Sequence, residues 1–365
     1  MLPLFDSYPA LQQALPFVSL GRYPTPVLRA DALDPDRRCA GLTVKHDGLS
    51  GTPYGGNKVR KLEFLFGDAL ARGKRAVLTF GGAGSNHALA TAIYAQRLGL
   101  QAYSFLLRQP NSRSLRYNLL RSLASGAHLR HFDSVPALAG GALLQEARLL
   151  FGAHQLPYWI PPGGSSALGV LGYVNAAFEL QRQVQAGGLA MPDVIYIASG
   201  TMGSAVGLAL GLAMLGLPAR VCAVAVTDRD FSSLDKARKL YAQASRLLRR
   251  AGLDRSPAAL QAERFTLRVD FFGGEYGRYT QAGMAAVKRF REATGMRIEG
   301  CYTGKCLAAL TADLQTGRLD GQRVLFWNTY DAGGQDHPVD AVDYRLLPAP
   351  FHRYFETNVQ PLDRD

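Results

Sequence analysis

Short runs of β-branched and aromatic residues alternate along this chain with longer runs in which apolar residues recur every three or four positions. The first kind of run predicts buried strands, and the second predicts helices with one apolar face. The expected strands are Ala76–Phe80, Ala102–Leu107, His128–Phe132, Val194–Ala198, Arg220–Val226 and Val324–Asn328. The expected helices begin near Leu62 and cover Asn86–Leu98, Ser112–Ser125, Ser232–Ala251 and Thr280–Thr294, with a turn at Gly81–Gly84. This alternation indicates an α/β protein whose parallel sheets are covered by helices.

Proline and glycine mark one boundary in this pattern. Pro157 is followed shortly by Pro161-Pro162-Gly163-Gly164, a run typical of a connection between units. We therefore expect two open, twisted α/β lobes, a large one formed by residues 1–61 and 160–365 and a small one formed by residues 62–159. A chain of 365 residues is long enough for both.

Val194–Ala219 contains no charged residue and is long enough to span a bilayer. Its character nevertheless changes along its length, because a β-rich run is interrupted at Ser199–Ser204 and a run of small apolar residues ends at Pro218. A strand, a glycine-containing loop and a buried helix account for all of these parts. We therefore expect no membrane partner.

Composition narrows the function classes further. Lys and Arg exceed Asp and Glu by 41 to 29, but the basic residues are scattered, so a nucleic-acid partner is not expected. Cys39, Cys222, Cys301 and Cys306 have neither the spacing of a zinc site nor the density of a disulfide scaffold, which predicts no metal and a reducing cytoplasm. Residues Met1–Pro16 lack the features of a secretory signal.

Lys58 follows Gly55-Gly56-Asn57 at the start of an expected helix. The apolar face of that helix is formed by Leu62, Leu65, Phe66, Ala69 and Leu70. Helical geometry places Lys58 near the centre of this face and Lys61 toward its edge. An ammonium group directed inward must be paired, deprotonated or used covalently, whereas the alternative is a lysine that extends to solvent from a helix start.

Two turns between a strand and a helix carry glycine and hydroxyl residues, Phe80–His87 and Ser199–Ser204. Backbone N–H groups at a helix N-terminus bind anions or flat polar rings. The second loop lacks the lysine of a Walker loop and the dinucleotide-binding glycine pattern, so a terminal phosphate monoester fits it better. In the first turn, the alternative is a tight turn in which Ser85 or Asn86 caps the helix, and this is compatible with a binding site. His87 can be either a proton shuttle or a packing residue.

Taken together, these segments resemble the fold-type-II pyridoxal-phosphate enzymes, specifically the group that contains D-cysteine desulfhydrase and 1-aminocyclopropane-1-carboxylate deaminase. The matching segments are Tyr23–Val27, Val44–Leu49, Gly55–Glu63, Ser85–His87, Ile160–Gly169, Gly172-Tyr173, Ser199–Ser204 and Cys301–Lys305. The resemblance implies that pyridoxal 5'-phosphate is bound between the two lobes.

The resemblance also implies individual roles. The implied catalytic residues are Lys58, which would carry the cofactor as a Schiff base, with Ser85, Tyr276 and Tyr302. The implied cofactor-binding residues are Asn57 and Asn86 near the ring oxygen, Ser199, Gly200, Thr201, Met202 and Gly203 around the phosphate, and Thr329 facing the ring nitrogen. The implied substrate-binding residues are Ser85, Asn86, His87 and Tyr302.

Departures from the family pattern surround the expected substrate pocket. Gly84 stands where relatives that cleave D-cysteine carry glutamine, and Glu299-Gly300-Cys301 replaces Asp-Pro-Val. Tyr330-Asp331 replaces a pair of glycines, and Thr303 replaces the glutamate of the deaminase subgroup. We infer a retained cofactor and an altered substrate site. Cys301 and Cys306 are expected to be small buried hydrophobes, and residues 337–365 an arm that packs on the body or on a partner subunit.

The leading functional hypothesis is α,β-elimination from a small amino acid with a β leaving group, with D-cysteine as the default substrate and a 2-keto acid and ammonia as products. The alternatives are a β-replacement synthase and a lyase or deaminase of another polar amino acid, including 1-aminocyclopropane-1-carboxylate. A cofactor-binding protein without turnover is the hypothesis from a different class. Relatives make a cytoplasmic homodimer the expected form.

Overall fold

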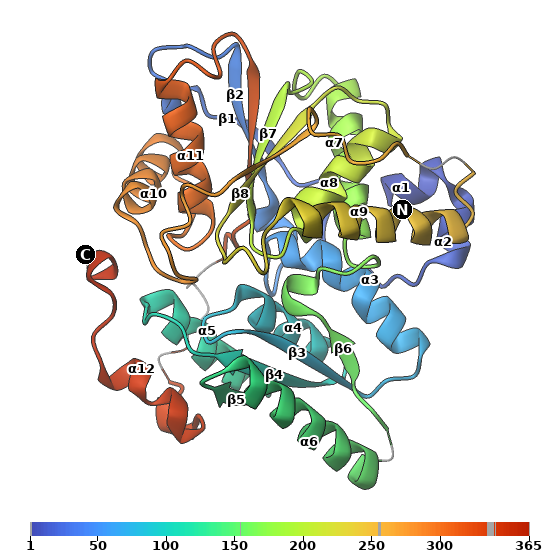
Figure 1. Ribbon diagram of the computed structural model, residues 1–365, viewed down its shortest axis with the longest axis vertical. Coiled ribbons are helices and arrows are strands. Elements are labelled where there is room, and N and C mark those ends of the chain that lie inside the picture. Colours follow the sequence, from blue (N-terminus) through green and yellow to red (C-terminus); the bar gives the residue numbers. More distant parts are fainter. Residues whose placement is uncertain (1, 154, 255–256, 334–338, 340, 365) are drawn as a thin grey trace.

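The strands of this protein form two sheets (Figure 1). The computed structural model describes residues 2–153, 155–254, 257–333, 339 and 341–364. The larger sheet has the order β1-β2-β10-β7-β8-β9 and is parallel except between β1 and β2. The smaller sheet has the order β5-β4-β3-β6 and is parallel throughout. The strands are β1 Val27–Arg29, β2 Gly41–His46, β3 Ala76–Gly82, β4 Gln101–Leu107, β5 His128–Phe132, β6 Tyr158–Ile160, β7 Val194–Ser199, β8 Arg220–Ala225, β9 Phe265–Arg268 and β10 Arg323–Asn328.

Helices connect most of the parallel strands. They are α1 Pro3–Ser7, α2 Pro9–Ala14, α3 Asn57–Ala71, α4 Asn86–Arg97, α5 Arg113–Ala124, α6 Val135–Ala153, α7 Leu171–Gln185, α8 Gly203–Met214, α9 Leu234–Arg250, α10 Gln281–Thr294, α11 Thr303–Gln315 and α12 Arg353–Glu356. Side-chain oxygens that accept a backbone N–H bond in the first turn cap several of them, namely those of Ser85, Ser112, Ser233 and Thr280. These caps satisfy donors that a helix start leaves free.

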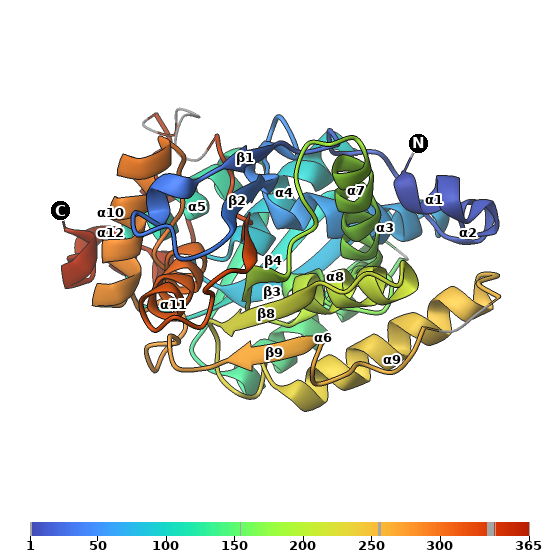
Figure 2. The ribbon, with the colours of Figure 1, turned by 90° about the horizontal axis from the view of Figure 1, so that it is seen from above.

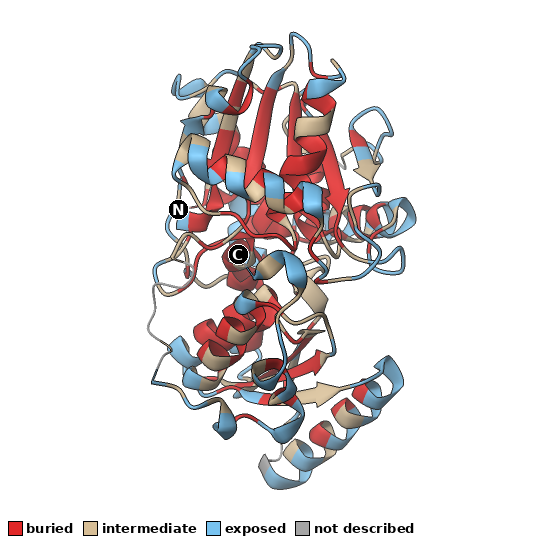
Figure 3. Ribbon diagram, turned by 90° about the vertical axis from the view of Figure 1, so that its left-hand side faces the viewer, coloured by how far each residue is buried: buried red, intermediate tan, exposed pale blue. Residues whose placement is uncertain are grey.

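The larger sheet is buried on both faces, and β7 shows why its sequence is apolar without alternation. Ile195 and Ile197 pack in a cluster with residues of α7, α8 and α9. Val194, Tyr196 and Ala198 point the other way, into a cluster with residues of α10 and α11. Viewed from above, these two groups of helices lie at opposite sides of the strands (Figure 2). The exposed surface is left to the outer helix faces and the loops (Figure 3).

The uncharged stretch after residue 194 is a strand, a loop and a helix, as predicted. It comprises β7 and α8, and residues 203–212 of α8 are all buried. Among the described residues, no helix has the length and apolar character needed to cross a membrane. The absence of charge therefore reflects burial inside the protein.

The α/β class with parallel sheets is confirmed, and all six expected strands exist. The predicted turn at Gly81–Gly84 is wrong at its first two residues, because Gly81 and Gly82 extend β3 and pair with Leu106 and Leu107. The helix expected near Leu62 begins earlier, at Asn57. The short strands β1, β6 and β9, the strand β2 and the helices α6, α7 and α11 were not predicted. The division into residues 1–61 and 160–365 against 62–159 stays a prediction.

The carboxyl ends of three strands lead directly into the segments expected to carry chemistry. Thr329 follows β10, Gly200 follows β7, and Ser85 lies three residues after β3. Ligands of open parallel sheets bind beyond the carboxyl ends of their strands. The fold therefore directs attention to the region where these segments meet.

Candidate active site

The start of α3 is fixed against the end of β10 by two glycines. Gly56 has φ +84°, and a Cβ atom there would lie 2.6 Å from the carbonyl oxygen of Thr329. A Cβ atom at Gly55 would lie 1.9 Å from the carbonyl oxygen of Gly48. The Asn57 N–H donates to the Thr329 carbonyl at 3.1 Å. Only glycine permits this close approach, and the approach sets the position of the next residue, Lys58.

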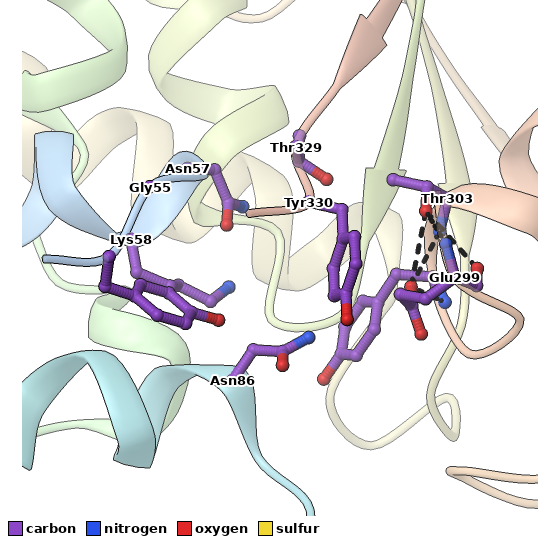
Figure 4. Close-up of a pocket in the computed structure, with 10 residues that line it drawn as sticks. Gly55, Asn57, Lys58, Asn86, Glu299, Thr303, Thr329 and Tyr330 are labelled. Carbon is purple, nitrogen blue, oxygen red and sulfur yellow. Dashed lines mark hydrogen bonds between the residues drawn. The ribbon is translucent and has the colours of Figure 1, made fainter. Parts of the chain in front are cut away.

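Lys58 lines a pocket to which four separate segments of the chain contribute. The pocket is lined by Tyr54, Gly55, Asn57, Lys58, Asn86, Glu299, Tyr302, Thr303, Thr329 and Tyr330. Figure 4 shows Lys58 and Asn86 on one side, Glu299 and Thr303 on the other, and Tyr330 between them. The Lys58 ammonium lies 5.9 Å from the centre of the Tyr302 ring. Burial lowers the pKa of Lys58 to about 8, against the opposing influence of the Glu299 charge.

The serine–asparagine turn contributes one residue to this lining. Ser85 caps α4, where its hydroxyl accepts the N–H of Ala88 at 3.3 Å. Asn86 lines the pocket, and its side-chain oxygen accepts a hydrogen bond from Asn118 at 2.9 Å. His87 is buried against Gly164, and burial together with the charges of Lys58 and Lys61 lowers its pKa well below the usual range. Ser85 and His87 are not among the residues that line the pocket.

The loop between β7 and α8, together with the first turn of α8, lies beside Asn57 and Tyr302. Met202 caps α8 in the left-handed conformation, with φ +63°, which a non-glycine residue adopts at some cost in energy. The hydroxyl of Ser204 accepts a hydrogen bond from the Asn57 amide at 3.0 Å. A Cβ atom at Gly200 would lie 3.3 Å from the Tyr302 ring. The loop therefore offers helix N-terminal N–H groups at one end of the site.

Lys61 is a site residue whose importance the sequence pattern did not indicate. Its side chain is 2% exposed, and its ammonium donates to the carbonyl of Gly163 at 3.0 Å and to the hydroxyl of Ser165 at 3.3 Å. No carboxylate pairs with it among the described residues. Burial first, and the charge of Lys58 second, lower its pKa well below the usual range. Its spacing of three residues from Lys58 was the available signal.

A phosphate group fits the surroundings of Lys61. A Cβ atom at Gly203 would lie 2.3 Å from the Ser165 hydroxyl and 2.7 Å from the Lys61 nitrogen. The Ser165 hydroxyl is also 2.7 Å from that of Thr201. A buried cation with only neutral acceptors, next to hydroxyls and a helix N-terminus, matches the needs of a phosphate monoester.

The two tyrosines singled out from the sequence form a pair. The hydroxyls of Tyr276 and Tyr302 are 2.6 Å apart, and their rings meet edge to face. Burial raises the pKa of both phenols, so both remain protonated at neutral pH. A protonated phenol close to a lysine of lowered pKa supplies an acid and a base in one pocket.

Glu299 contributes a carboxylate to the pocket and also caps α11. Its oxygens accept the backbone N–H groups of Cys301, Tyr302 and Thr303 at 2.7, 2.7 and 3.1 Å. Burial raises its pKa, and these N–H groups oppose that shift. The capping bonds explain why the segment before Tyr302 retains an acidic residue. Cys301 and Cys306 are buried, as expected of small apolar residues, and burial raises the pKa of both thiols.

Two α/β sheets whose parallel strands end at a buried lysine and at a glycine-containing loop before a helix are the architecture of a fold-type-II pyridoxal-phosphate enzyme. The family model described as pyridoxal-phosphate dependent enzyme matches residues 18–329, and the chain belongs to this family. A Pyrococcus horikoshii relative, to which 1-aminocyclopropane-1-carboxylate deaminase activity is provisionally ascribed, is 33% identical over 82% of this chain and 86% of its own length. The D-cysteine desulfhydrase of Serratia proteamaculans is 32% identical over 79% of this chain and 86% of its own length.

Solved structures agree with this assignment. The crystal structure of an ACC deaminase homologue superposes with a TM-score of 0.76 at 31% identity, and the match covers 89% of this chain and 94% of that one. A fungal L-serine ammonia-lyase from Rhizomucor miehei superposes with a TM-score of 0.59 over 93% of this chain and 99% of its own, at 19% identity. The second likeness concerns the fold alone.

Proposed function

We propose that this protein catalyses pyridoxal-phosphate-dependent α,β-elimination from a small amino acid that carries a β leaving group. The observation that carries the proposal is the pocket in which Lys58, with its pKa lowered to about 8, faces the hydrogen-bonded Tyr302–Tyr276 pair. Water is consumed, and the products are a 2-keto acid, ammonia and the protonated leaving group. Relatives named as desulfhydrase and deaminase support this class of reaction.

The residues around the pocket fit the cofactor as follows. Lys58 would hold it covalently, Thr329 would face the ring nitrogen, and Asn57 and Asn86 would contact the ring oxygen or the substrate carboxylate. The phosphate would be held by Lys61 and by the loop residues Ser199, Gly200, Thr201, Met202 and Gly203. When bound, pyridoxal phosphate supplies an electron sink for a carbanion at the substrate Cα.

Proton transfers fall to the chain's own side chains. With its pKa near 8, Lys58 has an appreciable neutral fraction at physiological pH and can remove a proton from the substrate Cα. The phenol of Tyr302, supported by that of Tyr276, can donate a proton to the leaving group, since burial keeps both phenols protonated. Ser85 and His87, which flank the pocket residue Asn86 but do not line the pocket themselves, are proposed to lie near the substrate, with Ser85 assisting a proton transfer.

The default substrate is D-cysteine, which would give pyruvate, ammonia and sulfide. Thr303 donates its hydroxyl to Glu299 and offers no carboxylate of its own, which does not favour opening of a cyclopropane ring. Tyr330 lines the pocket where the family pattern has glycine, so a different polar amino acid remains part of the proposal.

The test is a screen of L- and D-amino acids with the cofactor-loaded protein, in which 2-keto acid and ammonia are measured together. The proposal predicts stoichiometric keto acid and ammonia from at least one amino acid with a β leaving group. A new amino acid formed in the presence of an added thiol would indicate β-replacement instead. Visible absorbance of the bound cofactor, with no keto acid from any tested amino acid, would support a cofactor-binding protein without turnover.

A cytoplasmic homodimer is the proposed form of the enzyme. All four cysteines are free thiols, which supports a reducing compartment. Light scattering coupled to gel filtration measures the oligomeric state directly, and a mass equal to that of one chain would contradict a dimer.

A further inference from the structure

The C-terminal tail, defined here as residues 341–364, lies beyond the segment that the family model matches. It runs beside the smaller sheet toward the loop between β9 and α10 (Figure 1). Leu347, Phe351 and Tyr354 are buried in the same apolar cluster as residues of α4 and α5. The tail is therefore packed against the body of the protein, and burial of these three side chains stabilises its position.

Hydrogen bonds from the part of the chain that holds the smaller sheet, called the smaller unit below, hold the tail on both sides of residue 360. The Asn111 amide donates to the carbonyls of Tyr354 at 2.8 Å and Thr357 at 3.0 Å. The Arg113 N–H donates to the Asp363 carboxylate at 2.5 Å. These hydrogen bonds fix the position of the residues between Thr357 and Asp363.

Gln360 lies between these anchors and forms hydrogen bonds with the loop between β9 and α10. Its own N–H donates to the Asn111 carbonyl at 3.0 Å. Its side-chain oxygen accepts the N–H of Tyr279 at 2.7 Å, and its side-chain nitrogen donates to the carbonyl of Gly277 at 3.1 Å. One amide thus joins the smaller unit to the loop that carries Tyr276.

Elsewhere that loop is held mainly at its start, where the Lys305 ammonium donates to the Phe272 carbonyl at 2.5 Å. Gly273, Gly274 and Gly277 all have φ between +81° and +85°, so regular structure is excluded at these points. The backbone hydrogen bond within the loop from Arg278 to Glu275 is long, at 3.3 Å. The loop nevertheless places the Tyr276 hydroxyl 2.6 Å from that of Tyr302. A displacement of about 1 Å at such a group can reduce a rate substantially.

We propose that Gln360 is a positioning residue: through the backbone at 277 and 279 it holds the tyrosine loop against the smaller unit, and it thereby fixes the Tyr276–Tyr302 pair. This inference rests on the proposed function in one respect, the part assigned to the two phenols in proton transfer. The Tyr279 hydroxyl also lies 3.1 Å from that of Ser114, so the loop keeps a second attachment when Gln360 is changed.

The test compares Gln360→Ala with wild type and with Asn358→Ala, an exposed amide residue of the same tail whose side chain forms no hydrogen bond with the described residues. In the cofactor-free proteins, we expect hydrogen exchange at the Tyr279 amide to be at least ~10-fold faster in Gln360→Ala. In the loaded enzymes, kcat should fall ~10-fold with KM within ~2-fold. The unfolding midpoint and the visible absorbance should match wild type, and Asn358→Ala should behave as wild type throughout.

Gln360→Glu refines the test, because its carboxylate still accepts the Tyr279 N–H but cannot donate to the Gly277 carbonyl. We expect exchange and kcat of this variant to lie between those of wild type and Gln360→Ala. Unchanged exchange in Gln360→Ala, or faster exchange with unchanged kcat, overturns the inference. If wild type releases no keto acid from any amino acid, the proposed function fails by itself, and the exchange rates still decide whether Gln360 holds the loop.

Discussion

Two consecutive residues of α3, Arg60 and Lys61, are both buried cations, and they meet opposite environments. Arg60 is 1% exposed and forms ion pairs with Asp47 at 2.7 Å and Glu179 at 2.8 Å. Lys45 also pairs with Glu179, so the cluster of four contains two positive and two negative groups. Lys61 is 2% exposed, and its hydrogen-bond partners are a carbonyl and a hydroxyl.

The charge of Arg60 is therefore paired with carboxylates within the fold, whereas that of Lys61 is not, and we propose that a ligand supplies its partner. Burial by itself would raise the pKa of Asp47, but Arg60 and Lys45 lower it to about 2, so the carboxylate stays ionised. Lys61 has no such compensation among the described residues, and its pKa is lowered instead. Buried charges are usually paired, so the lack of a carboxylate partner supports the phosphate-binding role proposed for Lys61. Lys58, three residues earlier on the helix, resembles Lys61 in that burial lowers its pKa.

The largest effect is expected at Lys58. Lys58→Ala should lower the rate of keto-acid formation by about 1000-fold or more, because it removes both the covalent attachment and the base. The visible absorbance of the lysine-bound cofactor should disappear, whereas the cofactor-free protein should remain folded by circular dichroism. Retention of that absorbance in Lys58→Ala would mean that another lysine carries the cofactor.

Arg60→Met tests the compensated half of the comparison. Removing one member of a buried ionic cluster leaves the carboxylates of Asp47 and Glu179 short of partners, and we expect the cofactor-free protein to lose about 3–5 kcal/mol of stability in chemical denaturation. Arg72→Met, at the C-cap of the same helix, is the matched control. Arg72 pairs with Asp68, but its side chain is 63% exposed, so its loss should change stability by about 0.5 kcal/mol or less. Equal effects of the two substitutions would remove the distinction.

Lys61→Met tests the uncompensated half. We expect the cofactor-free protein to be as stable as wild type or more so, because an isolated buried amine is replaced by an apolar chain. Affinity for pyridoxal phosphate should fall roughly 30-fold, equivalent to about 2 kcal/mol. Inorganic phosphate should raise the melting temperature of cofactor-free wild type and of Lys239→Met, an exposed control, but not of Lys61→Met. Equal stabilisation of all three proteins by phosphate would place the anion elsewhere.

The sequence pattern was sufficient for the parts of the fold that are set by local periodicity. Strand β7 is apolar up to its last residue, Ser199, and is followed by glycines and an apolar helix. Both ends of β7 and the start of α8 were predicted within a residue or two, whereas α8 ends at Met214, before the predicted stop at Pro218. β6 and β9 have only three and four residues, too few to show a period, and their pairing depends on partners distant in the chain. Gly81 and Gly82 were expected to turn, but pairing with β4 extends them.

The candidate site was accessible from the sequence where a motif and a resemblance coincided. Lys58, Asn57, Asn86, Tyr302 and Thr329 all line one pocket. The contribution of Lys61 was hidden because the helical projection placed it at the edge of an apolar face, whereas the segment around Gly163 covers that edge in the folded protein. Contacts made by the tail with the loop that carries Tyr276 join residues more than 80 positions apart, and no local pattern reports such a pairing.

The smallest predicted effect concerns pH and compares wild type with Lys58→Met, both without cofactor. The folded-state pKa of Lys58 is lowered from 10.5 to about 8 by burial, so between these values the unfolded chain holds a proton that the folded protein has released. Stability of wild type therefore rises with pH across this window relative to the variant. Below pH 8 the folded wild type must carry a buried ammonium, and Lys58→Met should be the more stable protein by a few degrees in melting temperature. That advantage should shrink as pH rises from 8 toward 10.5, because the folded wild type then no longer carries the buried ammonium. A difference that stays constant from pH 7 to pH 10 would show that Lys58, like Arg60, has its charge compensated within the fold.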